Sequence, residues 1–246
     1  MSSASNTLAL GRAEVGRLRR NKRYAIFTLA IPVLLYLVLA PEVKGAQVDG
    51  VNYAAYEMIA LASLGAFSGA LTGNAQRIAQ ERKDGWVRQL RLTPLPANAY
   101  VVGKIIAAMA VTLPSVLIVL LLGRFYGGVH LELWKWFAIF GVIWIGSLTF
   151  TALGIALGYR YAPDTVQPIA MIVYFAMSIF GGLWFSIGGT LAKFGKFLPT
   201  YQMTRIGTDL LAGRPIQTIA YIVIAAWFAA FLALAVLSVR ATAETV

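Results

Sequence analysis

The chain has 246 residues, of which 59% are hydrophobic and only 13% are charged, and it carries a formal net charge of +11. A soluble domain must keep a wetted polar surface, so this composition argues against a soluble enzyme, and disorder would need low hydrophobicity and high charge. The absence of cysteine excludes a disulfide scaffold and a cysteine-based metal site. The basic excess fits either a nucleic-acid-binding protein or a membrane protein with basic cytoplasmic loops.

The first 23 residues form a basic segment with one apolar face. Leu8, Gly11, Val15 and Leu18 recur at spacings of three and four residues, which places them on one side of a helix. This pattern predicts a helix lying in the membrane interface. The alternative is a solvated basic tail that only fixes the topology.

Six stretches of the chain are almost free of charge and long enough to cross a bilayer as helices. Backbone groups in lipid must be paired within such a segment, so helix is the expected state. We therefore predict an all-α integral membrane protein with a single transmembrane domain over residues 1–246. The predicted spans cover about 24–41, 54–75, 103–122, 136–159, 166–187 and 216–239. A cleaved signal peptide is the alternative for the first span, but the polar stretch before it has 23 residues, which is long for a signal sequence.

The distribution of Lys and Arg between these spans predicts the orientation. One alternating side, which includes both termini, holds fourteen of these residues, and the other side holds seven. The richer side is expected to be cytoplasmic. The protein should therefore lie in the cytoplasmic (inner) membrane with both termini in the cytoplasm, and the basic charge needs no nucleic acid to explain it.

The loop after the second span, residues 76–104, combines many charges with a small apolar ridge. Ile78, Trp86 and Leu90 fall near one helical face, and Gly85 interrupts the helix. Pro94 and Pro96 end it, because proline lacks a donor and disfavours a helical conformation in the residue before it. Such a helix suits a groove on a soluble partner, and a solvated connector is the alternative.

This loop also resembles a known family. Glu81-Arg82, Gly85, Leu90, Thr93-Pro94-Leu95 and Gly103-Lys104 look like the loop between spans two and three of type-2 ATP-binding-cassette permeases. A second patch is similar to the same family, with Gly181-Gly182-Leu183-Trp184-Phe185 ending span five and Leu198-Pro199-Thr200-Tyr201 before span six. The sequence departs from the family at Ser186, where many relatives carry proline, and at Val87-Arg88.

The resemblance implies a permease subunit that couples to a separate ATPase. In the family the loop helix sits on the ATP-hydrolysing subunit and transmits its closure. The residues to which we assign this coupling role are Arg77, Glu81, Arg82, Lys83, Asp84, Gly85, Arg88, Leu90 and Pro94. The chain contains no complete Gly-x-x-x-x-Gly-Lys-Ser/Thr phosphate-binding loop. ATP and Mg²⁺ are therefore expected on the partner, with no cofactor or metal in this chain.

Two spans carry glycine at every fourth position, which lets helix backbones approach closely in lipid. These glycines are Gly65, Gly69 and Gly73 in span two and Gly154 and Gly158 in span four. They could form a sliding surface around a translocation path, or they could serve static packing.

The segment between spans five and six is apolar for an external loop. Two short helices, over about 187–197 and 201–211, are predicted to dip into the outer leaflet as a re-entrant hairpin, which related permeases also have. Gly188, Gly189, Pro199 and Tyr201 would then belong to an outer gate. An ordinary surface loop is the alternative.

Together these features predict the transmembrane half of an exporter for hydrophobic or amphipathic molecules, such as drugs or lipids. Aromatic residues of the spans would line the path; they are Phe67, Phe150, Tyr174, Phe175 and Phe180. Expected partners are the ATPase subunit, a second copy or a sister permease, and membrane lipids. A membrane scaffold or sensor, and an ion-coupled carrier, are the alternatives. No residue set suggests catalysis in this chain, because its one histidine, His130, stands apart from any acidic or serine cluster.

Overall fold

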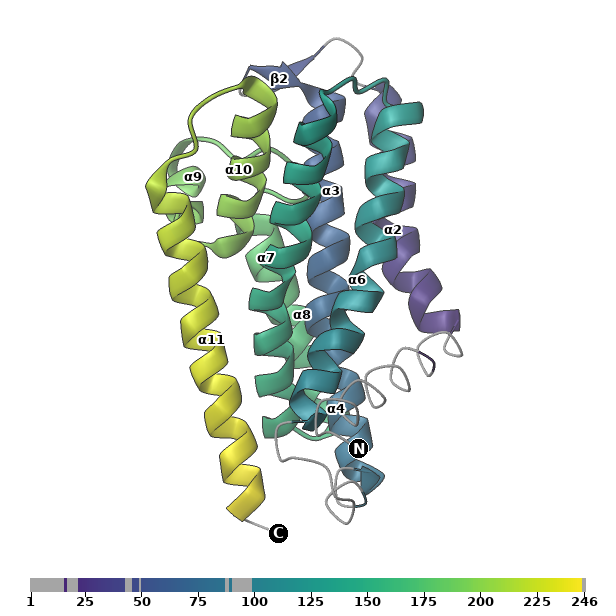
Figure 1. Ribbon diagram of the computed structural model, residues 1–246, viewed down its shortest axis with the longest axis vertical. Helices are drawn as coiled ribbons and strands as arrows, with labels where there is room; N and C mark the ends of the chain where they lie inside the picture. The colour runs from purple at the N-terminus through teal and green to yellow at the C-terminus, as the bar shows by residue number, and fades with distance from the viewer. Residues whose placement is uncertain are drawn as a thin grey trace.

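The computed structural model describes residues 22–42, 46–48, 50–86 and 99–244, together with the single residues 16 and 89. The predicted interfacial helix before residue 22 and the loop over 90–98 lie outside these residues. Within them the protein is a bundle of long helices (Figure 1).

Five helices in the described part of the chain are long and apolar enough to cross a membrane. The first is a continuous helix over Tyr53–Lys83, built from α3 (Tyr53–Ser68), η1 (Gly69–Gly73) and α4 (Asn74–Lys83). The others are α6 (Ala99–Phe125), α7 (Leu133–Arg160), α8 (Pro163–Phe180) and α11 (Thr218–Glu244). The protein is therefore a multi-pass membrane protein by helix length and composition.

The helix α2 (Lys22–Glu42) is also apolar and packs against α3 and α6. It has 21 residues, and its apolar part within the described side chains is the shorter segment Leu29–Ala40. After α2 comes a two-stranded antiparallel hairpin, formed by β1 (Gln47–Val48) and β2 (Val51–Asn52). Asn52 then begins α3, because its side-chain oxygen accepts a hydrogen bond from the amide of Ala54 at 2.8 Å.

The helix α3 forms the centre of the bundle. It contacts α2, α6, α7, α8 and α10, whereas α11 lies at the edge and contacts α7 and α10 (Figure 1). The ring centroid of Phe67 lies 4.1 Å from that of Phe150 and 5.1 Å from that of Tyr174, and all three side chains are buried. These three aromatic residues, predicted to line a path, are core residues in this chain, whereas Phe175 and Phe180 face outward.

The middle of the Tyr53–Lys83 helix contains a widened π-helical turn, η1. All five of its residues are buried. Side chains donate to carbonyls at its two ends: the Thr72 hydroxyl donates to Ser68 O, just before η1, at 2.8 Å, and the Arg77 guanidinium donates to Gly73 O, in the last residue of η1, at 3.3 Å. Turns of this kind disturb the regular backbone ladder and are often found at functional positions.

The two ends of the bundle differ. One end, the α4 end, holds α4 and the C-terminal end of α11 (Figure 1). The opposite end, the α10 end, holds the β hairpin, α9 (Gly189–Gly195) and α10 (Pro199–Ala212) (Figure 1). The Thr200 hydroxyl donates to Met177 O of α8 at 2.7 Å and so anchors the start of α10 inside the bundle.

The sequence predicts that the fifth long apolar stretch is helical to residue 187. In the structure this helix ends earlier. The helix α8 ends at Phe180, and Gly182 adopts a positive φ of 74° in the turn that follows. A Cβ on Gly181 would lie 2.1 Å from Thr200 Oγ1, so α10 packs tightly against this turn. Of the apolar residues after it, Leu183 is buried in the bundle whereas Phe185 is exposed, and a hydropathy pattern cannot distinguish these two environments.

Candidate functional site

The charged residues of α4 meet two other helices at the α4 end. The Glu81 carboxylate lies on one side, with its Oε1 and Oε2 both 2.6 Å from Lys104 Nζ of α6. The Tyr100 hydroxyl, one turn before Lys104, donates to Glu81 Oε2 at 2.7 Å. A buried ammonium requires such partners, because an unpaired charge out of water is costly.

Lys104 is the most deeply buried member of this network. Its side chain is 1% exposed, against 18% for Glu81. Its ammonium also lies 5.0 Å from the centre of the Tyr100 ring, within the range of a cation–π contact. The network therefore fixes α4 to α6 at a defined position.

Arg82, the next residue, reaches a different helix because adjacent residues on a helix point about 100° apart. Its Nη1 donates to Gly158 O at 3.0 Å and to Tyr159 O, both in the last turn of α7. The final carbonyls of a helix lack partners within it and carry partial negative charge, so a guanidinium is well suited to them. Arg82 Cζ also lies 5.5 Å from the centre of the Tyr159 ring.

The two contacts are joined by packing between tyrosines. The rings of Tyr100 and Tyr159 meet edge to face, with centroids 6.2 Å apart. Ile78 of α4 belongs to the same buried cluster, and Trp86 packs against it from beyond the turn. The end of α4 is therefore held simultaneously by α6 and by the end of α7.

The tip of α4 faces outward. Lys83 Nζ and Asp164 Oδ2 are 3.9 Å apart, with both side chains mostly exposed, so this ion pair contributes little stability. Asp84 accepts a hydrogen bond from Gln80 Nε2 at 2.9 Å. Gly85 follows with a φ of 74°, a left-handed conformation that favours glycine, and the chain turns there.

Comparison with known proteins identifies the family. A family described as "ABC-2 family transporter protein" matches residues 41–238. The chain belongs to the ABC-2 transporter family. It is also similar to the protein named "Putative transport permease YvfS" of Bacillus subtilis (strain 168), with 25% identity over 206 residues, which cover 82% of this chain and 83% of that protein.

The type-2 ATP-binding-cassette permease family recognised in the sequence is thus the correct one, and family membership implies a partner ATPase subunit. The structure also brings two separate parts of the recognised motif together, since Glu81-Arg82 and Gly103-Lys104 meet in one network. Arg88, Leu90 and Pro94 of the predicted coupling set lie outside the described residues. Arg77 lies one turn closer to η1, where its Nη2 donates to Asn74 Oδ1 at 3.3 Å.

Sequence reasoning about this ABC-2 chain missed Tyr100 and Tyr159 as members of the network, and it missed Lys104 as the partner of Glu81. A signal for Lys104 was available, because a lysine one turn inside an apolar helix needs an internal partner. The tyrosines gave no such signal, since aromatic residues at span ends are ordinary interface residues.

Two of the predicted glycines lie in α7 and pack against the Tyr53–Lys83 helix, which carries Glu81 and Arg82. A Cβ on Gly154 would be 2.7 Å from Ala70 O of η1, and a Cβ on Gly158 would be 2.7 Å from Ile78 Cβ of α4. Gly65 instead faces α6, where a Cβ would be 2.1 Å from Ser115 Oγ. Gly69 and Gly73 lie at the two ends of η1.

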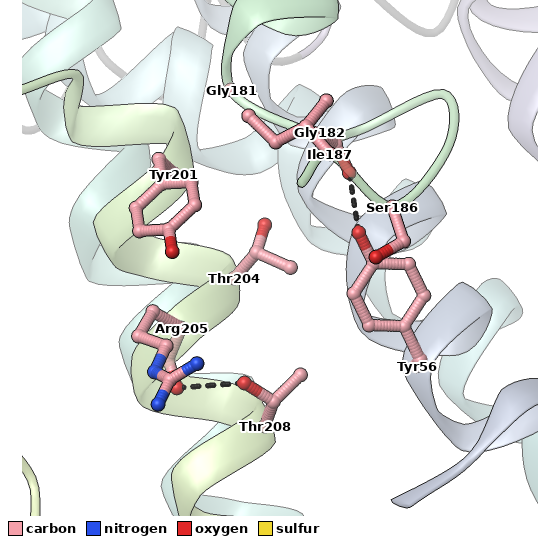
Figure 2. A pocket seen from close by; sticks show the side chains of 9 residues that line it. All are labelled: Tyr56, Gly181, Gly182, Ser186, Ile187, Tyr201, Thr204, Arg205 and Thr208. Atoms are coloured by element: carbon pink, nitrogen blue, oxygen red, sulfur yellow. Dashed lines mark hydrogen bonds between the residues drawn. The ribbon is translucent and has the colours of Figure 1, made fainter. Parts of the chain in front are cut away.

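The residues predicted as an outer gate lie at the α10 end. Gly188 and Gly189 precede and begin α9, and Pro199 occupies the first turn of α10. Tyr201 lines a small pocket between α10, Tyr56 of α3 and the loop after α8 (Figure 2). In the described part of the chain, no group of three or more His, Asp or Glu side chains is placed to hold a metal ion.

Proposed function

We propose that this ABC transporter permease is the membrane half of an exporter that moves hydrophobic or amphipathic molecules, driven by ATP hydrolysis on a separate subunit. The observation that carries the proposal is the double attachment of α4. Glu81 binds α6 and Arg82 binds the end of α7, while the neighbouring Lys83 and Asp84 remain exposed at the tip. A force applied at the tip would therefore reach two other long helices directly.

In this mechanism the coupling residues divide into two groups. Lys83, Asp84 and the turn at Gly85 contact the ATPase, together with Arg88, Leu90 and Pro94 further along the loop. Glu81 and Arg82 transmit the movement to α6 and α7, and Arg77 supports the helix next to η1. The widened turn η1 then acts as the hinge that lets α4 tilt while α3 stays packed in the core.

The proposal includes a topology. The helix α2 is the sixth span, the α4 end and both termini face the cytoplasm, and the chain is inserted in the inner membrane. The α9–α10 hairpin is re-entrant and belongs to the outer gate. Two permease copies, or this chain and a sister permease, surround the path, and the outward-facing Phe175 and Phe180 contribute to it.

The test is transport by proteoliposomes that contain this chain and its ATP-binding-cassette ATPase. We expect ATP-driven movement of an amphipathic fluorescent dye by the wild type and its loss in Glu81→Lys. The exchange Glu81→Lys with Lys104→Glu restores the attraction between α4 and α6, so it should recover a substantial part of the rate. Glu132→Lys, an exposed charge change beyond the network, is the matched control.

Wild-type transport by Glu81→Lys would contradict the coupling role. A folded complex of this chain and the ATPase that hydrolyses ATP but moves no amphipathic dye or lipid would contradict the proposed cargo.

A further inference from the structure

The helix α9 and the two residues after it present an exposed surface that combines apolar and basic side chains. The apolar members are Leu191, Phe194 and Phe197, which are 47%, 68% and 68% exposed. The basic members are Lys193 and Lys196, which are both exposed. We call these five residues the α9 surface.

The opposite side of α9 is attached to the bundle. Gly195 is buried, and a Cβ on it would lie 2.7 Å from Phe180 O of α8. Just after α9, the Phe197 carbonyl accepts a hydrogen bond from Trp227 Nε1 of α11 at 2.6 Å. Contacts with two long helices therefore hold α9 in place at the outside of the bundle, beside α10 (Figure 1).

The hydrogen bond from Trp227 also fixes the level of α9 along the bundle. Trp227 comes nine residues after Thr218, the first residue of α11, which corresponds to about 14 Å along a helix axis. The segment Thr218–Ala241 is one of the candidate membrane spans. The α9 surface therefore lies beside a membrane-spanning helix and not beyond its end, so its apolar side chains meet lipid and not a soluble partner.

The two lysines have no acidic partner in the part of the chain that the structure describes. Neither ammonium takes part in an ion pair there, and the sequence contains no Asp or Glu between Asp164 and Asp209. A lysine beside apolar side chains in a membrane extends its charged end toward the headgroups. Two neighbouring ammonium groups at that level attract an anionic phosphate.

We propose that the α9 surface binds an anionic phospholipid of the surrounding leaflet. Lys193 and Lys196 contact the phosphate of this lipid, and Leu191, Phe194 and Phe197 pack against its acyl chains. The ligand has a net negative headgroup, such as phosphatidylglycerol, because a zwitterionic headgroup carries its own cation beside the phosphate. The inference requires only that the chain spans a membrane, and it is independent of the proposed ATPase coupling and cargo.

The experiment places a fluorescent reporter on the α9 surface. The chain has no cysteine, so Phe194→Cys in the full chain gives a single attachment site. Proteoliposomes of phosphatidylcholine contain a small fraction of phosphatidylglycerol, or of phosphatidylcholine, whose acyl chains carry a nitroxide quencher. We expect half-maximal quenching at an about tenfold lower fraction of the labelled phosphatidylglycerol. At Ile145→Cys, an exposed position of α7, the two labelled lipids should quench equally.

Changes at the two lysines test the headgroup contact. Lys193→Gln with Lys196→Gln should remove the preference seen by the reporter at Phe194→Cys, whereas Lys193→Arg with Lys196→Arg should keep it. Arg124→Gln with Lys135→Gln is the matched control, because it removes the same charge from α6 and α7 at the α10 end and should leave the preference unchanged. Equal losses in the two glutamine pairs would overturn the proposal, since they would mean general attraction to a basic surface.

Three other results would also overturn the proposal. The first is equal quenching by the two labelled lipids at Phe194→Cys with both lysines present. The second is a reporter that neither lipid quenches but that iodide quenches from the water. The third is oxidative cross-linking of two chains through Phe194→Cys, which would assign the α9 surface to a second copy.

Discussion

The single residue on which the α4 end depends most is Lys104. It is a lysine inside an otherwise apolar helix, and its side chain is almost fully buried. Such a charge is tolerated because the Glu81 carboxylate and the Tyr100 ring surround it. Glu81 is partly exposed, so it is in contact with solvent as well as with Lys104.

Removing one member of this pair should be costly. We expect Lys104→Met to lower the free energy of unfolding by about 3 kcal/mol, because it leaves the Glu81 carboxylate beside an apolar group. Adding Glu81→Gln in the same chain should recover part of the loss, since no unpaired charge then remains. Unfolding in increasing concentrations of SDS measures both variants. Equal stability of Lys104→Met and the wild type would show that the Lys104–Glu81 pair does not stabilise the contact between α6 and α4.

Arg82 makes contacts that a lysine reproduces only in part. Its Nη1 donates to two successive carbonyls at the end of α7 and its guanidinium lies near the Tyr159 ring, so the shorter side chain in Arg82→Lys should weaken these hydrogen bonds. We expect a loss of about 1 kcal/mol in unfolding free energy and a lower coupling of ATP hydrolysis to transport.

The control for Arg82 is Arg160→Lys, an exposed basic residue in the last turn of α7. Its unfolding free energy and transport rate should match those of the wild type. A similar change in both variants would mean that the effect comes from general charge chemistry near the α7 end and not from the contact with the carbonyls.

At the scale of elements, two glycines of α7 allow this helix to pack closely against the helix over Tyr53–Lys83. The spacing of Gly154 and Gly158 predicted a close helix contact, and the structure places both against η1 and α4. The sequence could not identify the partner helix, because small residues mark a contact face without naming what lies across it.

This contact leads to a test within one helix. Gly158→Ala should destabilise the protein by about 1–3 kcal/mol, because the added carbon would be 2.7 Å from Ile78 Cβ and 2.8 Å from a backbone oxygen, neither of which can swing away. Gly141→Ala in the same helix has no atom within 4 Å of the added carbon and should be neutral or stabilising, since alanine is the better helix former. Melting temperatures in detergent compare the two. Equal melting temperatures would contradict the close packing of α7 on α4.

The widened turn η1 gives a second test at this scale. A π-helical turn contains one more residue than an α-helical path between the same ends, so deletion of Ala70 should restore a regular helix while α3 and α4 keep their directions. We expect a folded protein with reduced ATP-driven transport, measured in proteoliposomes against the melting temperature of the same sample. Full transport by the deletion variant would show that η1 is not the hinge.

For the whole molecule, the charge-free stretches predicted the five long helices well, since few other structures satisfy a backbone in lipid. Their ends were less predictable. The helix of span two contains no proline and continues to Lys83, after which Gly85 adopts a positive φ, whereas α8 stops at Phe180, where α10 packs against the turn. The second effect depends on tertiary contact, which a linear pattern does not contain.

The candidate site was also only partly predictable, because tertiary contacts bring its residues together. The motif pointed to the loop after span two, but only the fold brings Lys104 and the carbonyls of Gly158 and Tyr159 to Glu81 and Arg82. These contacts join residues 23, 76 and 77 positions apart, and they follow from how the helices are arranged and not from spacing along the chain.

The central claim is that the exposed tip of α4 meets the ATPase, and site-specific photo-crosslinking tests it most directly. A photoreactive residue at Lys83, whose side chain is 58% exposed, should form a covalent product with the ATPase subunit in membranes. The same residue at Phe125, which is exposed at the α10 end, should form none. A product from Phe125, or none from Lys83 in a complex that hydrolyses ATP, would contradict the account.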